Sequence, residues 1–171
     1  ASFDHLVALI ELASRNEIKK VNLHLFTDGK DSPPQSSHSL LVKLKEATNK
    51  YNTGVLASIS GRHYSLDRDS HWDRTKAAYE VMVGASGQTE KKLENVIRAT
   101  YSEGKTDQEI PPLMIADQTH SVKDNDALIF FDFREDSIRQ IAHAFIDDDF
   151  KEFEAKKFEN LFIATMTEYT E

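Results

Sequence analysis

Charged side chains of both signs are concentrated between Arg62 and Arg74, where three arginines and three aspartates lie within thirteen residues. Guanidinium groups donate paired hydrogen bonds to phosphate and carboxylate, and the adjacent Gly61 would let a ligand approach the backbone closely. The cluster follows an apolar run, Val55–Ser60, that is typical of a strand. We therefore predict an oxyanion site at the carboxyl end of a strand, where open α/β sheets bind their ligands.

A purely structural role for these charges is the alternative, because charged residues at a helix start commonly cap the helix and pair with one another. Arg62 and Arg68 precede the helix that the sequence predicts next, whereas Asp73 and Arg74 fall close to its start. We therefore assign ligand binding to Arg62 and Arg68 and structural roles to Asp73 and Arg74.

Two further charged segments follow predicted strands. Residues 28–31 read Asp-Gly-Lys-Asp, and they are either a plain turn, which Asp-Gly favours, or a source of a cation, Lys30, and a base, Asp31. Arg134 follows an apolar run, Ala127–Phe133, that predicts a strand buried on both faces. In a parallel sheet the three strand ends share one edge, so these loops can converge on one ligand.

Other chemistries have weaker support in the sequence. Residues 124–126 (Asp-Asn-Asp) begin like a calcium loop but lack the glycine at the sixth position, so we interpret them as a solvated turn. The seven histidines have no metal-binding spacing, cysteine is absent, and no nucleophile or phosphate-loop motif is found. From the residues alone, we predict an arginine-lined anion pocket with one or two carboxylates, no metal and no visible nucleophile.

The overall charge limits the partners. A net charge of −8 argues against a nonspecific nucleic-acid or membrane surface, both of which require a basic face. The sequence has no apolar run long enough to span a bilayer, so we expect a cytoplasmic protein. The chain begins at Ala1, within a helical pattern and without a methionine, and we expect it to be a piece of a longer protein.

Hydrophobic periodicity predicts alternating helices and strands. Apolar spacing predicts helices around residues 3–15, 40–48, 75–82 (ending near Gly84 and Gly87), 93–100 and 138–145. Strands are predicted at 21–27, 55–60, 127–133 and 160–166, with a short edge strand at 113–116. The recurring order strand, loop, helix predicts a single α/β domain, residues 1–171, with three α/β/α layers and a mainly parallel central sheet.

Several motifs in register resemble those of a known family. They are F-D-H-L (3–6), D-G-K-D-S-P-P (28–34), S-G-R-H-Y-S-L-D-R-D-S-H-W-D-R (60–74), D-N-D-A-L-I-F-F-D-F-R (124–134) and M-T-E-Y (166–169). In order and spacing they resemble the substrate-binding, or transferase, domain of cofactor-independent phosphoglycerate mutase. The resemblance extends over essentially the whole chain.

This resemblance implies a division of labour between two domains. In that family a phosphatase-like domain carries a serine nucleophile and two manganese ions, and the domain that this chain resembles holds the glycerate while a phosphoryl group moves between its 3- and 2-hydroxyls. The chain would then bind phosphoglycerate or glycerate and its own phosphatase-like domain, with no nucleic acid or membrane partner. It would bind no cofactor itself and would be inactive alone.

The resemblance also assigns roles to residues. It places Arg62, Arg68 and Arg134 among the substrate-binding arginines, and it makes Asp31 the catalytic residue that exchanges a proton with the glycerate hydroxyl. Lys30 stands where the family usually has a substrate-binding arginine, and Ser137 stands where a second arginine is expected after Arg134. A lysine does not reproduce the paired donors of arginine, so a non-catalytic module that binds a phospho-ligand or a partner protein is the alternative function.

Overall fold

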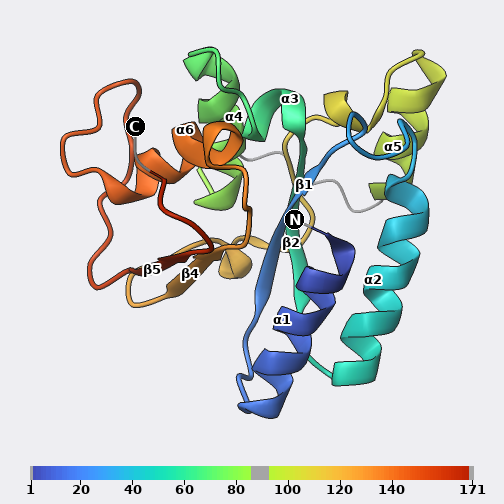
Figure 1. Ribbon diagram of the computed structural model, residues 1–171, viewed down its shortest axis with the longest axis horizontal. Helices are drawn as coiled ribbons and strands as arrows, with labels where there is room; N and C mark the ends of the chain where they lie inside the picture. Colours follow the sequence, from blue (N-terminus) through green and yellow to red (C-terminus); the bar gives the residue numbers. More distant parts are fainter. Residues whose placement is uncertain (1, 86–92, 170–171) are drawn as a thin grey trace.

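The computed structural model describes residues 2–85 and 93–169, and helices alternate with short strands along the chain (Figure 1). The predicted α/β class is confirmed. The helices of at least one turn and the strands are α1 (Phe3–Arg15), β1 (Asn22–Thr27), α2 (Ser37–Tyr51), β2 (Val55–Gly61), α3 (Arg62–Ser65), α4 (Trp72–Met82), α5 (Leu93–Ser102), β3 (Leu113–Met114), β4 (Ala127–Phe130), α6 (Glu135–Ile146) and β5 (Phe162–Thr165). Two short 3-10 helices, η1 (Asp107–Glu109) and η2 (Gln118–His120), flank β3.

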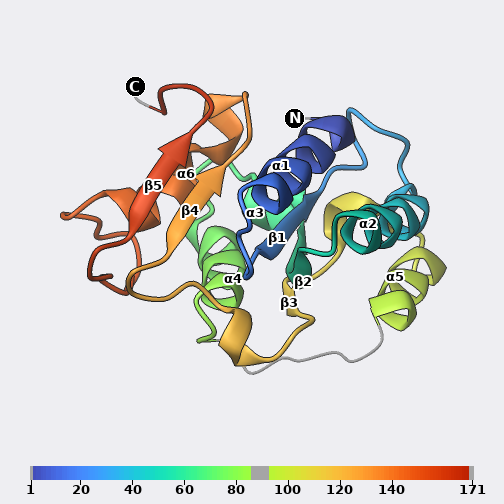
Figure 2. The same ribbon diagram turned by 90° about the horizontal axis from the view of Figure 1, so that it is seen from below.

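The strands form two small sheets where the sequence predicted one central sheet. In the first sheet β1 pairs with β2 in parallel, and the short strand β3 is antiparallel to β2 at the edge. The second sheet consists of β4 and β5, which are also parallel (Figure 2). The pairing is therefore mainly parallel, as predicted, but the hydrogen-bonded ladder does not continue from the first sheet to the second.

Helices cover both faces of the first sheet. On one side, Leu6 and Ile10 of α1 and Leu44 of α2 form a buried cluster with Leu23 of β1. On the other side, a cluster from α4, α6 and β4 packs against Phe26 of β1. The layers lie on opposite sides of β1 and β2 in Figure 1, so the backbone at the strand ends is held from both faces.

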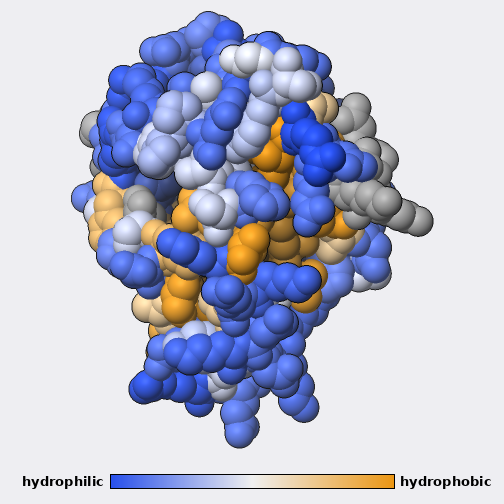
Figure 3. Space-filling model, turned by 90° about the vertical axis from the view of Figure 1, so that its right-hand side faces the viewer, coloured by the Kyte–Doolittle hydropathy of each residue, from blue (hydrophilic) through white to orange (hydrophobic). Residues whose placement is uncertain are grey.

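A third cluster lies beneath α5. Ile97 of α5 is buried with Ile59, Ile110 and Leu113. Figure 3 shows the side of the molecule formed by α2 and α5, which is mainly hydrophilic, with hydrophobic side chains exposed along a seam in its middle. These helices therefore have the amphipathic character that their apolar spacing predicted.

The prediction that strand 127–133 is buried on both faces is wrong. The strand ends at Phe130, which is 5% exposed, whereas Ile129 is 50% exposed. One face of the β4–β5 sheet packs on the cluster containing α6, whereas Phe162, on the same face as Ile129, is 65% exposed. Continuous apolar sequence therefore does not correspond here to burial on two sides.

The predicted helices all form, with boundaries shifted by a few residues. Helix α1 begins after Ser2, whose hydroxyl accepts a hydrogen bond from the backbone N–H of His5 while the His5 ring accepts one from the backbone N–H of Ser2. After α4, Gly84 has a φ of +73°, which suits glycine. The second predicted stop, Gly87, lies outside the described residues.

None of the described helices is long and apolar enough to cross a lipid bilayer.

Candidate functional site

The three charged segments predicted to converge do meet beyond the ends of β1, β2 and β4. Asp31, in the loop after β1, places its Oδ2 atom 3.3 Å from Nη1 of Arg62 and 2.6 Å from Nη1 of Arg134. Arg62 begins α3 directly after β2, and Arg134 follows β4 at the start of α6. Two guanidinium groups from different strand ends therefore share one carboxylate.

Arg62 is the more rigidly held of the two arginines. Its side chain is 14% exposed, and it also donates a hydrogen bond to Oδ1 of Asp28. Partial burial raises the pKa of Asp28, but hydrogen bonds from Arg62 and from Ser32 more than offset this effect, and the net pKa is below its usual value. Asp28 is thus ionised at neutral pH and fixes the Arg62 guanidinium beside Asp31.

The other half of this cluster is open to solvent. The side chains of Arg134 and Asp31 are 52% and 58% exposed. An exposed ion pair of this kind contributes little to stability, on the order of 0–1 kcal/mol. An incoming anion can therefore replace the Asp31 carboxylate at Arg134 with little cost in folding energy.

Arg68 lies beside this cluster in a separate ion pair. Its Nη1 atom is 2.5 Å from Oδ2 of Asp136, two residues beyond Arg134. Limited desolvation raises the pKa of Asp136, but hydrogen bonds from Ser137 and Arg68 lower it by more. Arg68 is therefore tied to the same helix start that presents Arg134.

Lys30 and Ser137 differ in their accessibility. Lys30 is exposed on the loop that carries Asp31. Ser137 is 3% exposed, and its Oγ atom donates a hydrogen bond of 3.0 Å to Oδ1 of Asp136. Ser137 therefore supports Asp136 and does not present a second donor to solvent.

The C-terminal part of the Arg62–Arg74 cluster is structural, as predicted for Arg74. Oδ1 of Asp67 accepts hydrogen bonds of 3.0 Å from the backbone N–H groups of Asp69 and His71. Arg74 lies 3.3 Å from the other oxygen of this carboxylate, whose side chain is only 5% exposed. Desolvation raises the pKa of Asp67, but hydrogen bonds from the backbone and ring of His71 lower it below its usual value. These contacts hold the start of α4; Asp73 is exposed in its first turn.

Two residues that support the site were not predicted from the sequence. The Asp-Gly pair at residues 28–29 indicates only a turn, yet Asp28 pairs with Arg62. Asp107 is 1% exposed and lies in η1, beneath the loop that carries Asp31. The only local signal near it is Thr106-x-x-Glu109, a capping box, which does not identify what the Asp107 carboxylate binds.

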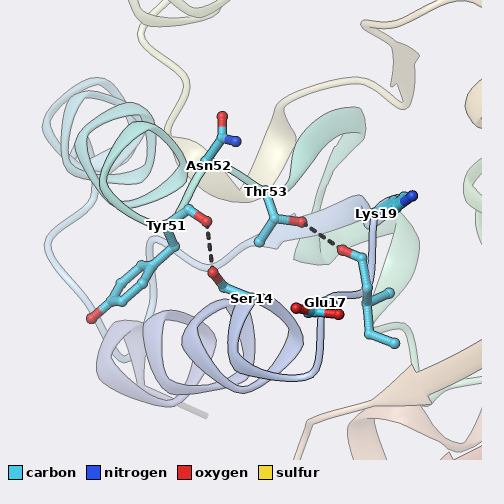
Figure 4. Close-up of a pocket in the computed structure, with 7 residues that line it drawn as sticks. Ser14, Glu17, Lys19, Tyr51, Asn52 and Thr53 are labelled. Atoms are coloured by element: carbon cyan, nitrogen blue, oxygen red, sulfur yellow. Dashed lines mark hydrogen bonds between the residues drawn. The ribbon is translucent and has the colours of Figure 1, made fainter.

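A hollow at the opposite end of the first sheet is separate from this cluster. It lies where α1 and α2 end, and it is lined by residues that include Ser14, Glu17, Tyr51 and Thr53 (Figure 4). Ser14 Oγ donates to the carbonyl of Tyr51 at 2.8 Å, and Thr53 Oγ1 donates to the carbonyl of Ile18 at 3.2 Å. Ser14 thus satisfies the last carbonyl of α2, and Thr53 satisfies a carbonyl in the segment after α1, so both polar side chains have structural roles.

The described residues offer no obvious metal site. Within 2–85 and 93–169, no group of three or more His, Cys, Asp or Glu side chains is placed to hold a metal ion. Residues 124–126 form a turn in which Oδ1 of Asp124 accepts a hydrogen bond of 3.1 Å from the backbone N–H of Glu159. The chemistry available to the cluster is therefore the binding and orientation of an anion by arginines, with a carboxylate beside it.

The structure is thus an α/β domain in which two arginines from different strand ends share one carboxylate. The family model described as "BPG-independent PGAM N-terminus" matches residues 1–171. The chain belongs to this family, where BPG stands for bisphosphoglycerate and PGAM for phosphoglycerate mutase.

Similar proteins agree with this assignment. The 2,3-bisphosphoglycerate-independent phosphoglycerate mutase of Clostridium perfringens strain SM101 is 40% identical over 169 residues, which are 97% of this chain and 33% of that protein. Phosphoglycerate mutase 1 of this type from Methanosarcina acetivorans is 39% identical over 172 residues, 98% of this chain and 33% of that protein. The chain thus spans about a third of the length of these curated relatives.

A solved structure has the same fold. The phosphoglycerate mutase of Leishmania mexicana, crystallised at low cobalt concentration, matches 95% of this chain and 32% of its own chain with a TM-score of 0.83 at 24% identity. This similarity confirms the arrangement of helices and strands.

Proposed function

We propose that this chain is the substrate-holding domain of a phosphoglycerate mutase that interconverts 3-phosphoglycerate and 2-phosphoglycerate in glycolysis. The observation that carries the proposal is the convergence of Arg62, Arg134 and Asp31 from three strand ends. Family membership supports the same conclusion. The substrate supplies the anionic groups that two or three arginines at one sheet edge would bind. For a protein with this role we expect a cytoplasmic location.

In this proposal the arginines bind and Asp31 moves a proton. Arg62, Arg134 and the neighbouring Arg68 hold the phosphate and carboxylate groups through charge-assisted hydrogen bonds, with the exposed Lys30 adding positive charge. Once the anion occupies the arginines, the Asp31 carboxylate is free to accept the proton of the glycerate hydroxyl that attacks the phosphoryl group. It can return this proton to the alkoxide oxygen that is left on the glycerate when a phosphoryl group departs.

The remaining chemistry belongs to a second domain. A serine there would carry the phosphoryl group between the 3- and 2-hydroxyls, and two manganese ions held by that domain would activate this serine. The described residues of this chain contribute positioning and proton transfer, so we expect the chain alone to have no mutase activity. Holding the glycerate close to the phosphoserine provides catalysis by proximity.

A chimeric enzyme tests this function. We would replace the matching third of the C. perfringens mutase with this chain and measure conversion of 3-phosphoglycerate to 2-phosphoglycerate. We expect activity in the chimera, loss of activity in its Asp31→Asn and Arg62→Ala variants, and none in the chain alone. A folded, manganese-loaded chimera without activity would contradict the proposal.

Ser137 motivates a second candidate function. Because a buried serine occupies the position where a second arginine is expected, the anion has fewer donors at this edge. A non-catalytic module that binds a phospho-ligand would give an inactive chimera although the chain itself still binds phosphoglycerate. If the missing donor makes the chimera inactive, Ser137→Arg should increase its activity. If the inactivity has another cause, Ser137→Arg should leave the activity unchanged.

A further inference from the structure

Asp107 is a buried carboxylate outside the cluster of arginines. Its Oδ2 atom accepts hydrogen bonds from the backbone N–H groups of Ser36 and Ser37, at 2.8 and 2.9 Å, and from the Ser36 hydroxyl at 3.2 Å. Its Oδ1 atom accepts a hydrogen bond from the hydroxyl of Tyr101. These four hydrogen bonds offset the hydration that the carboxylate loses on burial.

These contacts attach Asp107 to the far end of the loop that carries Asp31. Ser36 immediately precedes α2, and its own side chain makes no capping bond to that helix. Asp107 instead caps α2 from a distant part of the sequence, where a negative charge is also favoured by the helix dipole. The backbone N–H of Asp107 donates to the carbonyl of Pro34 at 2.8 Å, which fixes the same end of the loop a second time.

The near end of the loop is attached to Asp107 as well. The hydroxyl of Thr27, the last residue of β1, donates to the Asp107 carbonyl at 2.6 Å. Gly29 has a φ of +68°, and a Cβ atom at this position would lie 2.9 Å from the Cβ atom of Asp107. Asp107 therefore contacts both ends of the segment that carries Asp28 and Asp31.

The residues that follow Asp107 contact the strand end that carries Arg62. The backbone N–H of Gly61 donates to the carbonyl of Ile110 at 2.7 Å. A Cβ atom on Gly61 would lie 2.1 Å from the carbonyl oxygen of Gln108, so the two backbones are in close contact. Residues 107–110 thus touch the loop of Asp31 and the residue before Arg62 at the same time.

We propose that Asp107 is a positioning residue for the candidate anion site, and that its contacts set the place of Asp28 and Asp31 relative to Arg62. The expected effect of Asp107 on ligand binding rests on the proposed function. The expected effect of Asp107 on the position of the Arg62 side chain does not, because that position can be measured without a ligand. Burial, together with the hydrogen bond to Asp107, raises the pKa of Tyr101, so the hydroxyl remains protonated and keeps donating to Asp107 at neutral pH.

Four variants of the chain test this role. Asp107→Ala removes all the side-chain acceptors, Asp107→Asn keeps one acceptor oxygen, and Tyr101→Phe removes a single donor. Leu44→Ala is the matched control, because this core residue in α2 is 4% exposed and its truncation also destabilises the fold without touching the loop. All four are compared with the unmodified chain by thermal unfolding.

The first measurement needs no ligand. NMR of arginine side chains reports whether the Arg62 guanidinium is held in slow exchange by Asp28 and Asp31. We expect this signal to be lost in Asp107→Ala, weakened in Asp107→Asn and in Tyr101→Phe, and kept in Leu44→Ala. An unchanged Arg62 signal in a folded Asp107→Ala variant would overturn the proposal, and so would equal loss of the signal in Leu44→Ala. If Asp107→Ala does not fold, the same signal is read in Asp107→Asn and Tyr101→Phe: a weakened Arg62 signal supports the proposal, and an unchanged signal in both overturns it.

The second measurement is the preference for 3-phosphoglycerate over inorganic phosphate, taken as the ratio of the two dissociation constants. Misplacing Asp31 should lower this preference several-fold in Asp107→Ala, because phosphate lacks the hydroxyl that Asp31 would contact, and leave it unchanged in Leu44→Ala. Failure of the unmodified chain to bind phosphoglycerate would count against the proposed function, whereas the Arg62 signal would still decide the role of Asp107.

Discussion

Arg134 donates a hydrogen bond of 2.6 Å to Asp31, although 103 positions separate the two residues in the sequence. The carboxylate occupies a position on the guanidinium that a phosphate or carboxylate ligand would take. Asp31 is therefore an internal competitor for the anion that the site is proposed to bind.

Removing this competitor should strengthen the binding of a simple anion. In Asp31→Asn we expect the chain to bind inorganic phosphate several-fold more tightly, because Arg62 and Arg134 lose their ionised partner. Isothermal titration calorimetry measures this change. The control is Asp148→Asn, an equal charge change at a fully exposed residue beyond the end of α6. Unchanged or weaker phosphate binding in Asp31→Asn would contradict internal competition.

The two arginines should differ in their effect on stability. Arg134→Ala breaks an exposed ion pair, and we expect the free energy of unfolding to change by less than about 1 kcal/mol. Arg62→Ala removes the charged donor of the partly buried Asp28, and we expect a loss of about 1–3 kcal/mol. Urea denaturation measures both values. If the two variants lost the same free energy of unfolding, this would contradict the claim that burial makes Arg62 more important for stability than Arg134.

Gly61 should not tolerate a side chain. A methyl group at this position would lie 2.1 Å from the Gln108 carbonyl oxygen, so we expect Gly61→Ala to lower the free energy of unfolding by at least about 2 kcal/mol. The neighbouring Ser60→Ala is the control, because the buried Ser60 hydroxyl has no hydrogen-bond partner among the described residues and its removal should be neutral or stabilising. A stable Gly61→Ala variant would argue against close contact between residues 107–110 and β2.

Because His24 is partly buried, we expect the protein to lose stability in mildly acidic solution. Burial lowers the pKa of His24 to about 4, more than the nearby Asp126 raises it, and its Nδ1 atom lies 2.7 Å from the Ser58 hydroxyl. The unfolded chain binds a proton at this residue near pH 6.5, so stability falls as the pH drops from 6.5 towards 4.

The expected loss between pH 7 and pH 5 is about 2 kcal/mol from this residue. The lowered pKa values of Asp28, Asp67 and Asp136 act in a different window, because their contribution is present above about pH 4 and is lost only below it. Chemical denaturation at both pH values checks the difference. In His24→Gln the loss should be smaller by about this amount; an identical loss in this variant would contradict the assignment.

The sequence predicted those parts of the structure that depend on local pattern. The helices followed from apolar spacing, and the meeting of Asp31 and Arg62 followed from the rule that parallel strand ends share an edge. Arg134 joins them as predicted, although β4 belongs to the second sheet and not to the single sheet on which that prediction was based. The exposed face of β4–β5 could not be predicted, because an apolar run does not say whether a second layer covers it. Asp107 was missed because its partners, Ser36 and Ser37, are about 70 residues away.

The central claim is that Arg62 and Arg134 together bind phosphoglycerate. The most direct test is an NMR titration of the chain with 3-phosphoglycerate, read at the guanidinium signals of both arginines and at the backbone amide of Asp31. We predict that all three signals move with one dissociation constant, and that Arg62→Ala and Arg134→Ala each weaken binding at least about tenfold. No shift at millimolar ligand, or binding that survives both substitutions unchanged, would contradict the claim.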